Sequence, residues 1–272
     1  MLKTRVITAL VLLVLFLAAL FWLSPRAWAV FAGLMVAPAA WEWGKLIKLK
    51  GIACGLYVVL VGAACAGLFG LGQGGARATH TATFLAASLF WIAVVPLWLR
   101  HSWLPQSRWA AALTGLMVLL PTWLALVELR NLSPWHLLLL MSVAWISDIA
   151  AYFAGRRFGR NKLAPSISPG KTWEGVAGAL LAVSAYAALW SFAWEAYFPQ
   201  MFASLRFGAF GMLLFLWLLA AIGIYGDLFE SALKRRAGVK DSGSLLPGHG
   251  GVLDRIDALT AVLPVAALAY LQ

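Results

Sequence analysis

The chain has 272 residues, of which 63% are hydrophobic and only 11% are charged. Soluble domains contain roughly 45–50% apolar and about 25% charged residues, so this composition excludes a soluble protein and indicates an integral membrane protein. The formal net charge of +11 does not indicate a nucleic-acid partner, because the basic residues follow a membrane topology.

Nine windows of the chain are long and apolar enough to cross a membrane, which takes about 20 mostly apolar residues. They predict an all-α, polytopic bundle of about nine transmembrane helices at roughly residues 5–23, 26–42, 53–71, 82–99, 109–128, 135–155, 173–194, 207–230 and 252–271. The first window could instead be a cleavable signal, since "RAWA" resembles a signal-peptidase site. Signal peptides have an apolar region of about 7–15 residues, and the run from Val6 to Leu23 is longer, so we favour an uncleaved helix.

The basic residues gather on one side of this predicted bundle. When successive loops are assigned to opposite sides, all but four of the 21 Lys and Arg residues fall on the side of the amino terminus. The four exceptions are Arg26, Arg77, Arg130 and Arg206. The positive-inside rule therefore places the amino terminus in the cytoplasm. We interpret Lys45, Lys48 and Lys50 as contacts to anionic lipid headgroups.

The acidic residues divide the chain into two regions. Residues 1–147 contain only Glu42 and Glu128, both at the ends of predicted spans, and we interpret this region as a transmembrane scaffold. Residues 148–272 contain the other eight acids, seven of them at the cytoplasmic ends of spans six to nine. We predict that residues 148–272 form the catalytic transmembrane region.

Acids inside the last spans predict a metal site, because an ionisable residue in a span costs at least about 2.5–3.5 kcal/mol and needs a partner or a function. Three sets have the spacing of one helix face: Asp148 with Tyr152, Asp227 with Glu230, Ser231 and Lys234, and Asp254 with Asp257. The acids could simply pair with basic residues and tie helices together. The carboxylates outnumber such partners, however, and Mg²⁺ takes one or two carboxylates with water and substrate phosphates. We therefore predict a magnesium site whose candidate ligands are Asp148, Asp227, Glu230, Asp254 and Asp257.

A phosphate-binding segment precedes the seventh span, in "GRRFGRNKLAPSISPGKTWEG" at residues 155–175. Backbone N–H groups at a helix start, with a lysine and hydroxyls beside them, suit phosphate oxygens. The candidates are Arg156, Lys162, Ser168, Lys171 and Thr172. The segment is not a P-loop, since the earlier glycine spacing and the preceding strand are missing. Ser168 or Thr172 could instead cap the next helix, with Glu174 in its first turn, and for Thr172 both roles stay open.

The segment "SALKRRAGVKDSGSLLPGHGGVLDRID", residues 231–257, combines acids, bases and glycines between two apolar runs. Its basic residues can meet a polyphosphate: Lys234, Arg235, Arg236 and Lys240. Gly250 and Gly251 let the backbone approach a ligand closely, and His249 could bind phosphate or carry a proton. The two segments together predict a site for a phosphorylated soluble molecule and a lipid at the cytoplasmic mouth of the bundle.

The segment from Ser231 to Asp257 resembles the signature of the phosphatidate cytidylyltransferases, or CDP-diacylglycerol synthases. The matching positions are Ser231, Lys234, Arg235, Lys240, Asp241, His249, Gly250, Gly251, Asp254, Arg255 and Asp257. The stretch from Asp148 to residue 175 is similar to a second motif of that family, whereas the first 140 residues share only its hydropathy.

This resemblance implies an enzyme that transfers CMP from CTP to phosphatidic acid, needs Mg²⁺ with K⁺ nearby, and forms a homodimer with its active site facing the cytoplasm. The size of the chain and the lack of a targeting signal in it favour the bacterial inner membrane. The resemblance also implies that Asp227 and Asp254 hold the metal pair. Chemistry suggests the other roles: Asp148, Asp257 and Glu230 support the ion, and Lys171, Lys234, Arg235 and Lys240 neutralise the phosphates. Arg156 and Lys162 meet the lipid phosphate, and Asp241 and His249 orient nucleotide or water.

Two other functions remain alternatives. An ion-coupled transporter also carries intramembrane acids, but its sites usually lie near the bilayer midplane, whereas these acids gather at one end. A transferase that uses a lipid-linked diphosphate and a phospho-alcohol would place similar groups together without consuming CTP. A purely structural scaffold does not require seven acids at one mouth.

Overall fold

The computed structural model describes residues 2–73, 77–197, 208–246 and 248–270. Its helices are α1 (Leu2–Trp22), α2 (Pro25–Leu46), α3 (Ile52–Gln73), α4 (Arg77–Leu89), the π-helix η1 (Phe90–Val94), α5 (Val95–His101), α6 (Arg108–Leu132), α7 (Pro134–Phe158), α8 (Trp173–Tyr197), α10 (Ala209–Ala237) and α11 (Leu253–Tyr270). Two short strands, β1 (Lys162–Ala164) and β2 (Ser168–Thr172), lie between α7 and α8. Arg206 and the span ends at residues 207 and 271 lie outside the described residues.

Every predicted span coincides with a helix in the described part of the chain, and α4, η1 and α5 run on as the fourth span. Six segments there are long and apolar enough to cross a membrane: α3, α4 to α5, α6, α7, residues 173–190 of α8, and α10. Residues 7–22 of α1 form a shorter apolar helix. The all-α polytopic fold is therefore confirmed, and the count of nine crossings stays a prediction.

Serine and proline mark several helix starts. Ser24, Ser107 and Ser133 each accept a hydrogen bond from a backbone N–H of the first turn of α2, α6 and α7. Proline follows directly at the start of α2 and α7, where its missing N–H costs no helical hydrogen bond. At the other end of α10, Gly238 adopts a left-handed φ of 77°, which ends that helix.

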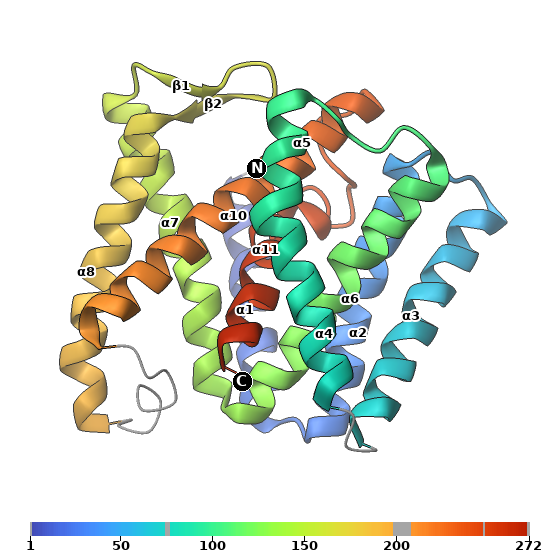
Figure 1. Ribbon diagram of the computed structural model, residues 1–272, viewed down its shortest axis with the longest axis horizontal. Helices are drawn as coiled ribbons and strands as arrows, with labels where there is room; N and C mark the ends of the chain where they lie inside the picture. The colour runs from blue at the N-terminus through green and yellow to red at the C-terminus, as the bar shows by residue number, and fades with distance from the viewer. Residues whose placement is uncertain (1, 74–76, 198–207, 247, 271–272) are drawn as a thin grey trace.

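The strands β1 and β2 form an antiparallel hairpin that lies over the ends of α7 and α8 (Figure 1). Lys162 pairs with Thr172, and Ala164 pairs with Ser168. The sequence predicts a helix start after "SPGKT", and α8 does begin at Trp173. The hairpin before it was not predicted from the sequence. It holds Lys162 and Lys171 at the end of the α7 and α8 pair.

Small residues bring α7 and α8 close together. A Cβ atom at Gly178 would overlap the Cβ atom of Ala154, and one at Gly175 would lie 2.9 Å from the carbonyl oxygen of Ala151. Such contacts let two membrane helices approach at backbone distance. The pair forms a tight wall beneath the hairpin.

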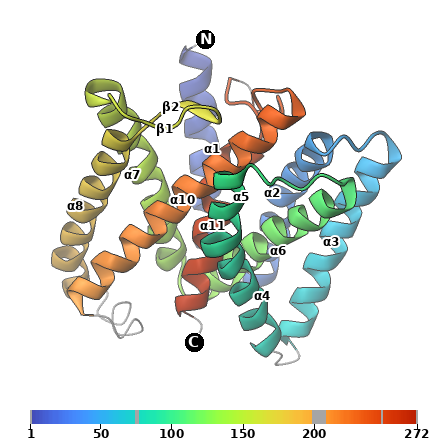
Figure 2. The same ribbon diagram turned by 45° about the horizontal axis from the view of Figure 1, so that its top comes forward.

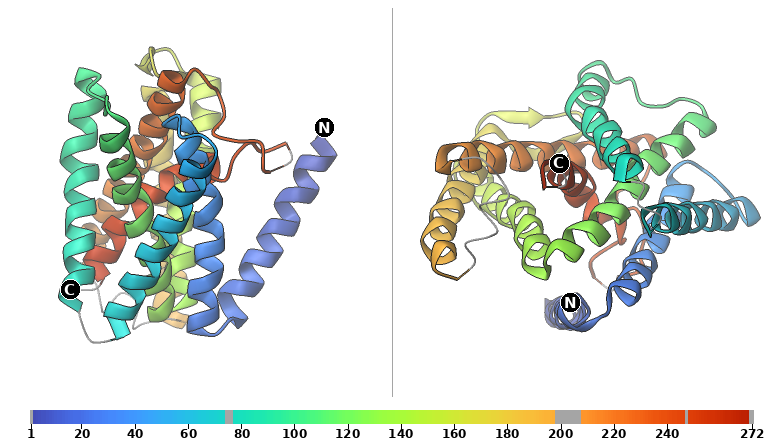
Figure 3. Two further views of the ribbon diagram at one scale, coloured as in Figure 1. Left: turned by 90° about the vertical axis from the view of Figure 1, so that its right-hand side faces the viewer. Right: turned by 60° about the horizontal axis from the view of Figure 1, so that its bottom comes forward.

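The helix α11 lies in the middle of the bundle (Figure 3), and all its residues from Ala258 to Ala267 are buried. It packs against α10 and α7, and also against α4 and α6 of the predicted scaffold. The long helix α10 runs obliquely across the bundle (Figure 1). The first described residues lie at the hairpin end, and α11 ends at the opposite end (Figure 2).

Candidate functional site

A cavity of about 650 Å³ lies beneath the hairpin, between α7, α8, α10 and the start of α11. Five carboxylates line it: Asp148, Asp227, Asp241, Asp254 and Asp257. Five cationic side chains line it as well: Arg156, Lys162, Lys171, Lys234 and Arg255. Each of these ten residues was a candidate from the sequence, and the fold brings all of them to one space. A cavity with both charge signs can hold an anion and a cation together.

Asp227 extends from α10 and bridges two elements of the cavity wall. Its Oδ2 atom lies 2.5 Å from the ammonium nitrogen of Lys171 in β2. Its Oδ1 atom accepts a hydrogen bond of 3.2 Å from the hydroxyl of Ser231, one turn further along α10. Ser231 therefore contacts the Asp227 carboxylate, as their spacing on one helix face predicts.

Lys234 is the centre of a buried charge cluster between α10 and α11. Its ammonium group lies 2.5 Å from Glu230 Oε2 and 2.6 Å from Asp254 Oδ1. The three side chains are only 12%, 4% and 5% exposed, in the order Lys234, Glu230, Asp254. The second oxygen of Glu230, Oε1, is buried with no hydrogen-bond partner. The cluster thus carries one excess carboxylate around a single ammonium group.

Asp254 also anchors the loop between α10 and α11. Its carboxylate accepts hydrogen bonds from the backbone N–H of Ser242, at 3.2 and 3.0 Å, and of Gly251, at 2.8 Å. Gly250 has a φ of 82°, and a Cβ atom there would lie 2.9 Å from Asp254 Oδ2. The glycine lets the loop fold closely over this carboxylate.

Asp148 and Asp257 complete the acidic side of the cavity. The carboxylates of Asp148, Asp227 and Asp257 lie close enough to interact electrostatically, and Lys171 interacts with Asp148. Asp257 Oδ1 accepts a hydrogen bond of 2.8 Å from the backbone N–H of Ala258. The negative charges of acids from α7, α10 and α11 therefore act on the same space, and they favour the binding of a cation between them.

Thr172 caps α8. Its hydroxyl accepts a hydrogen bond of 3.1 Å from the backbone N–H of Gly175, and the residue is buried although it lines the cavity. Glu174 instead binds the loop before β1, because it accepts hydrogen bonds from the backbone and side-chain nitrogens of Asn161. Capping is thus an observed role of Thr172, and ligand contact stays a prediction.

Replacing Thr172 with valine should lower the free energy of unfolding by about 1 kcal/mol, because a helix cap is lost without a change in shape. The measurement is thermal unfolding of purified protein in detergent. Thr172→Ser keeps the hydroxyl and should unfold close to the wild type. Equal unfolding temperatures for the valine and serine variants would contradict the capping role.

Eight candidate residues do not line this cavity: Ser168, Glu230, Ser231, Arg235, Lys240, His249, Gly250 and Gly251. Arg236, named with the basic residues of the same segment, does not line it either. Most of the eight hold the cavity wall together. Arg235 donates to the carbonyl oxygen of Ile167 in the hairpin at 3.4 Å, and the backbone N–H of His249 donates to Leu246 within the loop. Ser168 starts β2 and does not cap α8. Substrate contacts by these eight residues stay predictions.

Glu42 is one of the two acids of the predicted scaffold, and it contacts the loop beside the cavity. It belongs to α2 and is only 3% exposed. Its carboxylate accepts hydrogen bonds from the hydroxyl of Ser242 and from the backbone N–H groups of Val252 and Leu253. The sequence does contain a signal for this residue, because Glu42 is an acid within the apolar run "AAWEWG". The same signal identified the acids of α10 and α11.

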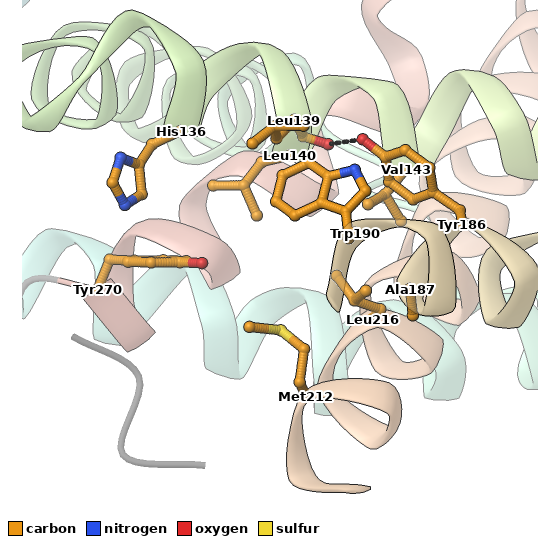
Figure 4. A pocket seen from close by; sticks show the side chains of 10 residues that line it. All are labelled: His136, Leu139, Leu140, Val143, Tyr186, Ala187, Trp190, Met212, Leu216 and Tyr270. Atoms are coloured by element: carbon orange, nitrogen blue, oxygen red, sulfur yellow. Dashed lines mark hydrogen bonds between the residues drawn. The ribbon is translucent and has the colours of Figure 1, made fainter. Parts of the chain in front are cut away.

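A second cavity, of about 20 Å³, lies between α7, α8, α10 and the end of α11 (Figure 4). Its lining is largely apolar, with His136, Tyr186 and Tyr270 as polar members. The dashed line in Figure 4 marks the Tyr186 hydroxyl, which donates to the carbonyl oxygen of Leu139 at 3.4 Å. Among the described residues, no carboxylate or lysine side chain lines it.

Known proteins resemble this chain along almost its whole length. The model of the cytidylyltransferase family matches residues 3–272. A curated protein of Pseudomonas aeruginosa named phosphatidate cytidylyltransferase is 40% identical, over 98% of this chain and 96% of its own length. Proteins of the same name are 33% identical in Haemophilus influenzae, over 99% of both chains, and 36% identical in Brucella suis, over 99% of this chain and 92% of theirs. The chain therefore belongs to the cytidylyltransferase family.

Proposed function

We propose that this membrane protein transfers the CMP unit of CTP to phosphatidic acid, giving CDP-diacylglycerol and pyrophosphate for phospholipid synthesis. The observation that carries the proposal is the cavity in which five carboxylates and five cationic side chains face one space in a bundle with six candidate membrane spans in its described part. The curated relatives carry the name of this activity.

The reaction is a phosphoryl-type transfer, which depends on positioning and on charge neutralisation. An oxygen of the phosphatidate phosphate attacks the α-phosphorus of CTP and forms a new P–O bond. The bond from that phosphorus to the oxygen bridging it to the β-phosphorus breaks, and pyrophosphate leaves with the electron pair. No covalent enzyme intermediate is needed, so the residues of the cavity bind, orient and neutralise.

The carboxylates of the cavity suit a magnesium ion that is only partly coordinated by protein, and not a metal ion that is coordinated by protein alone. Among the described residues, no three His, Cys, Asp or Glu side chains form a metal-binding group. Asp227 and Asp254 line the cavity, and each already holds an ammonium group within 2.6 Å. Mg²⁺ usually takes one or two carboxylates and completes its shell with water and phosphates. We therefore assign Asp227 and Asp254 as ligands, with Asp148 and Asp257 beside them, and Glu230 in support through Lys234.

When bound, the ion would neutralise part of the triphosphate charge. A nearby K⁺ remains a proposal based on the resemblance alone. Lys171 and Lys234 would neutralise the remaining charge of the triphosphate and of the leaving pyrophosphate, since both line the cavity. Asp241, also in the lining, would orient the nucleotide. Lys240, Arg235 and His249 would act from the rim of the cavity.

The lipid would enter between α7 and the hairpin. Tyr152 lines the cavity and is 59% exposed, and its neighbours Ile149 and Phe153 on α7 are exposed as well. Exposed apolar side chains on a membrane helix face lipid. Arg156 and Lys162 belong to the same part of the lining and would receive the lipid phosphate.

The cellular setting is also part of the proposal. The basic residues predict that the hairpin end, and thus the cavity, faces the cytoplasm. The curated relatives named above come from bacteria, which supports the inner membrane as the location. A homodimer is proposed from the resemblance.

The test uses purified protein in detergent with labelled CTP, phosphatidic acid and Mg²⁺. We expect pyrophosphate and CDP-diacylglycerol in equal amounts, and no product when a chelator removes the divalent ion. A transferase that uses a lipid-linked diphosphate would leave CTP unconsumed, and a transporter would instead show ion flux in liposomes. Either result, without labelled lipid, would reject the proposal.

A further inference from the structure

The loop between α10 and α11 is held by a carboxylate from the opposite half of the chain. Glu42 Oε2 accepts a hydrogen bond of 3.1 Å from the Ser242 hydroxyl and one of 2.8 Å from the backbone N–H of Leu253. Its Oε1 atom accepts one of 3.1 Å from the backbone N–H of Val252. No lysine or arginine pairs with Glu42 among the described residues. The three donors, two of them backbone N–H groups at the start of α11, stabilise the buried negative charge of Glu42.

The loop approaches Glu42 so closely that a side chain at either of two glycine positions would displace its neighbours. A Cβ atom at Gly243 or at Gly251 would overlap the Glu42 carboxylate. Neither glycine has a positive φ, so the backbone conformation alone does not require glycine at either position. The space is taken by Glu42 at Gly243, and by Glu42 together with the Ser242 hydroxyl at Gly251. The loop is therefore shaped around the Glu42 side chain.

Ser242 connects Glu42 to the candidate site. Its hydroxyl donates to Glu42, and its backbone N–H donates to Asp254. Ser242 is only 6% exposed, so both bonds are shielded from water. Asp241, the preceding residue, lines the cavity. Ser242 thus contacts both Glu42 and Asp254 and directly follows Asp241 in the chain.

We infer that Glu42 is a positioning residue for cytidylyl transfer: it acts through Ser242 and the start of α11 to hold Asp254 and Asp241 in the cavity. The inference rests on the proposed function for its kinetic part. A carboxylate is required because both of its oxygens accept hydrogen bonds. In a glutamine, one oxygen is replaced by an NH₂ group, which would face an N–H or O–H donor and leave it unpaired.

The first test is Glu42→Gln, assayed for CDP-diacylglycerol formation. We expect kcat to fall roughly 10- to 100-fold, the range seen when groups that orient catalytic ligands are replaced. The KM for CTP should stay near the wild-type value, because the lost interaction acts on the transition state and not on CTP binding. Glu128→Gln is the matched control, since Glu128 is the other acid of the first half and pairs with His80 at 3.2 Å, away from the loop. It should keep wild-type kcat.

A second readout does not depend on activity. Trypsin cleavage after Lys240, followed by mass spectrometry, should be several-fold faster in Glu42→Gln than in the wild type, because the loop is no longer held at Ser242. If the wild type makes no CDP-diacylglycerol, the proposed function fails, and this cleavage rate still tests the contact. Wild-type kcat, or an unchanged cleavage rate, in a folded Glu42→Gln protein would overturn the inference.

The variant Gly243→Ala tests the same contact from the loop side if Glu42→Gln does not fold. It keeps the Glu42 carboxylate in the chain but adds a Cβ atom that would overlap it, so the side chain or the loop must shift. We expect a lower kcat per folded protein than in the wild type, and a lower unfolding temperature in detergent because the buried carboxylate is displaced. Wild-type kcat in Gly243→Ala would show that the loop does not depend on Glu42 and would reject the inference. A loss of activity only in proportion to unfolded protein would reject it as well.

Discussion

Asp227→Asn is expected to reduce CDP-diacylglycerol formation by at least about a hundredfold, the scale of losing one group that stabilises transition-state charge. Asp227 lines the cavity, contacts Lys171 at 2.5 Å and accepts a hydrogen bond from Ser231. Asparagine has the same shape, but it is neutral and cannot hold a cation in the same way. Labelled CTP incorporation into lipid measures the effect at saturating substrate.

The variant should remain folded, because the partner that it leaves behind is not deeply buried. The Lys171 side chain is 21% exposed, so solvent can compensate for the lost carboxylate. Glu128→Gln serves again as a neutralised acid outside the cavity and should keep full activity. Near-normal CDP-lipid formation by Asp227→Asn would refute its assignment as a ligand. The same substitution at Asp254 should also stop turnover.

Lys234→Met is expected to have the largest effect on stability. Methionine fills most of the volume but leaves Glu230 and Asp254 as two buried carboxylates without their shared ammonium group. Removing one partner of a buried ion pair costs about 3–5 kcal/mol, and here one ammonium group serves two partners. For a chain of this size the unfolding temperature should fall by on the order of 10 °C. Thermal unfolding in detergent measures the shift.

Arg236→Met is the matched control for Lys234→Met. Arg236 lies two residues further along α10, is exposed, and donates to the carbonyl oxygen of Pro105 at 2.6 Å. Its replacement should change the free energy of unfolding by no more than about 1 kcal/mol. Equal shifts for the two variants would show that Lys234 does not stabilise a buried charge cluster.

The helices could be predicted from the sequence because each depends on local composition. A run of about 20 apolar residues must form a helix in a membrane, so each predicted window contains one. Helical spacing also predicted that Asp227 and Lys234 share a face, and both line the cavity. The charge count placed the acids of α7, α10 and α11 at one end, and five carboxylates meet there.

Long-range contacts were not predictable in this way. Glu42 and Ser242 are 200 residues apart in the chain, and no periodicity links them. The hairpin of β1 and β2 has strands too short to show an alternating pattern. Spacing on α10 put Glu230 and Ser231 on the face of Asp227 and Lys234, but it did not predict that Glu230 would contact Lys234 or that Ser231 would contact Asp227. Periodicity predicts which side chains share a helix face, but it does not predict which residue each of them contacts.

The pair of Lys171 and Asp227 has a consequence for ligand affinity. While each is the counterion of the other, neither is fully available to an incoming group. A phosphate that binds Lys171 on its own would leave the partly buried Asp227 carboxylate without a counterion. A metal ion that binds Asp227 on its own would likewise leave the Lys171 ammonium group without a counterion. Joint occupancy avoids both penalties. Nucleotide and divalent ion should therefore raise each other's affinity by the same factor, as thermodynamic reciprocity requires.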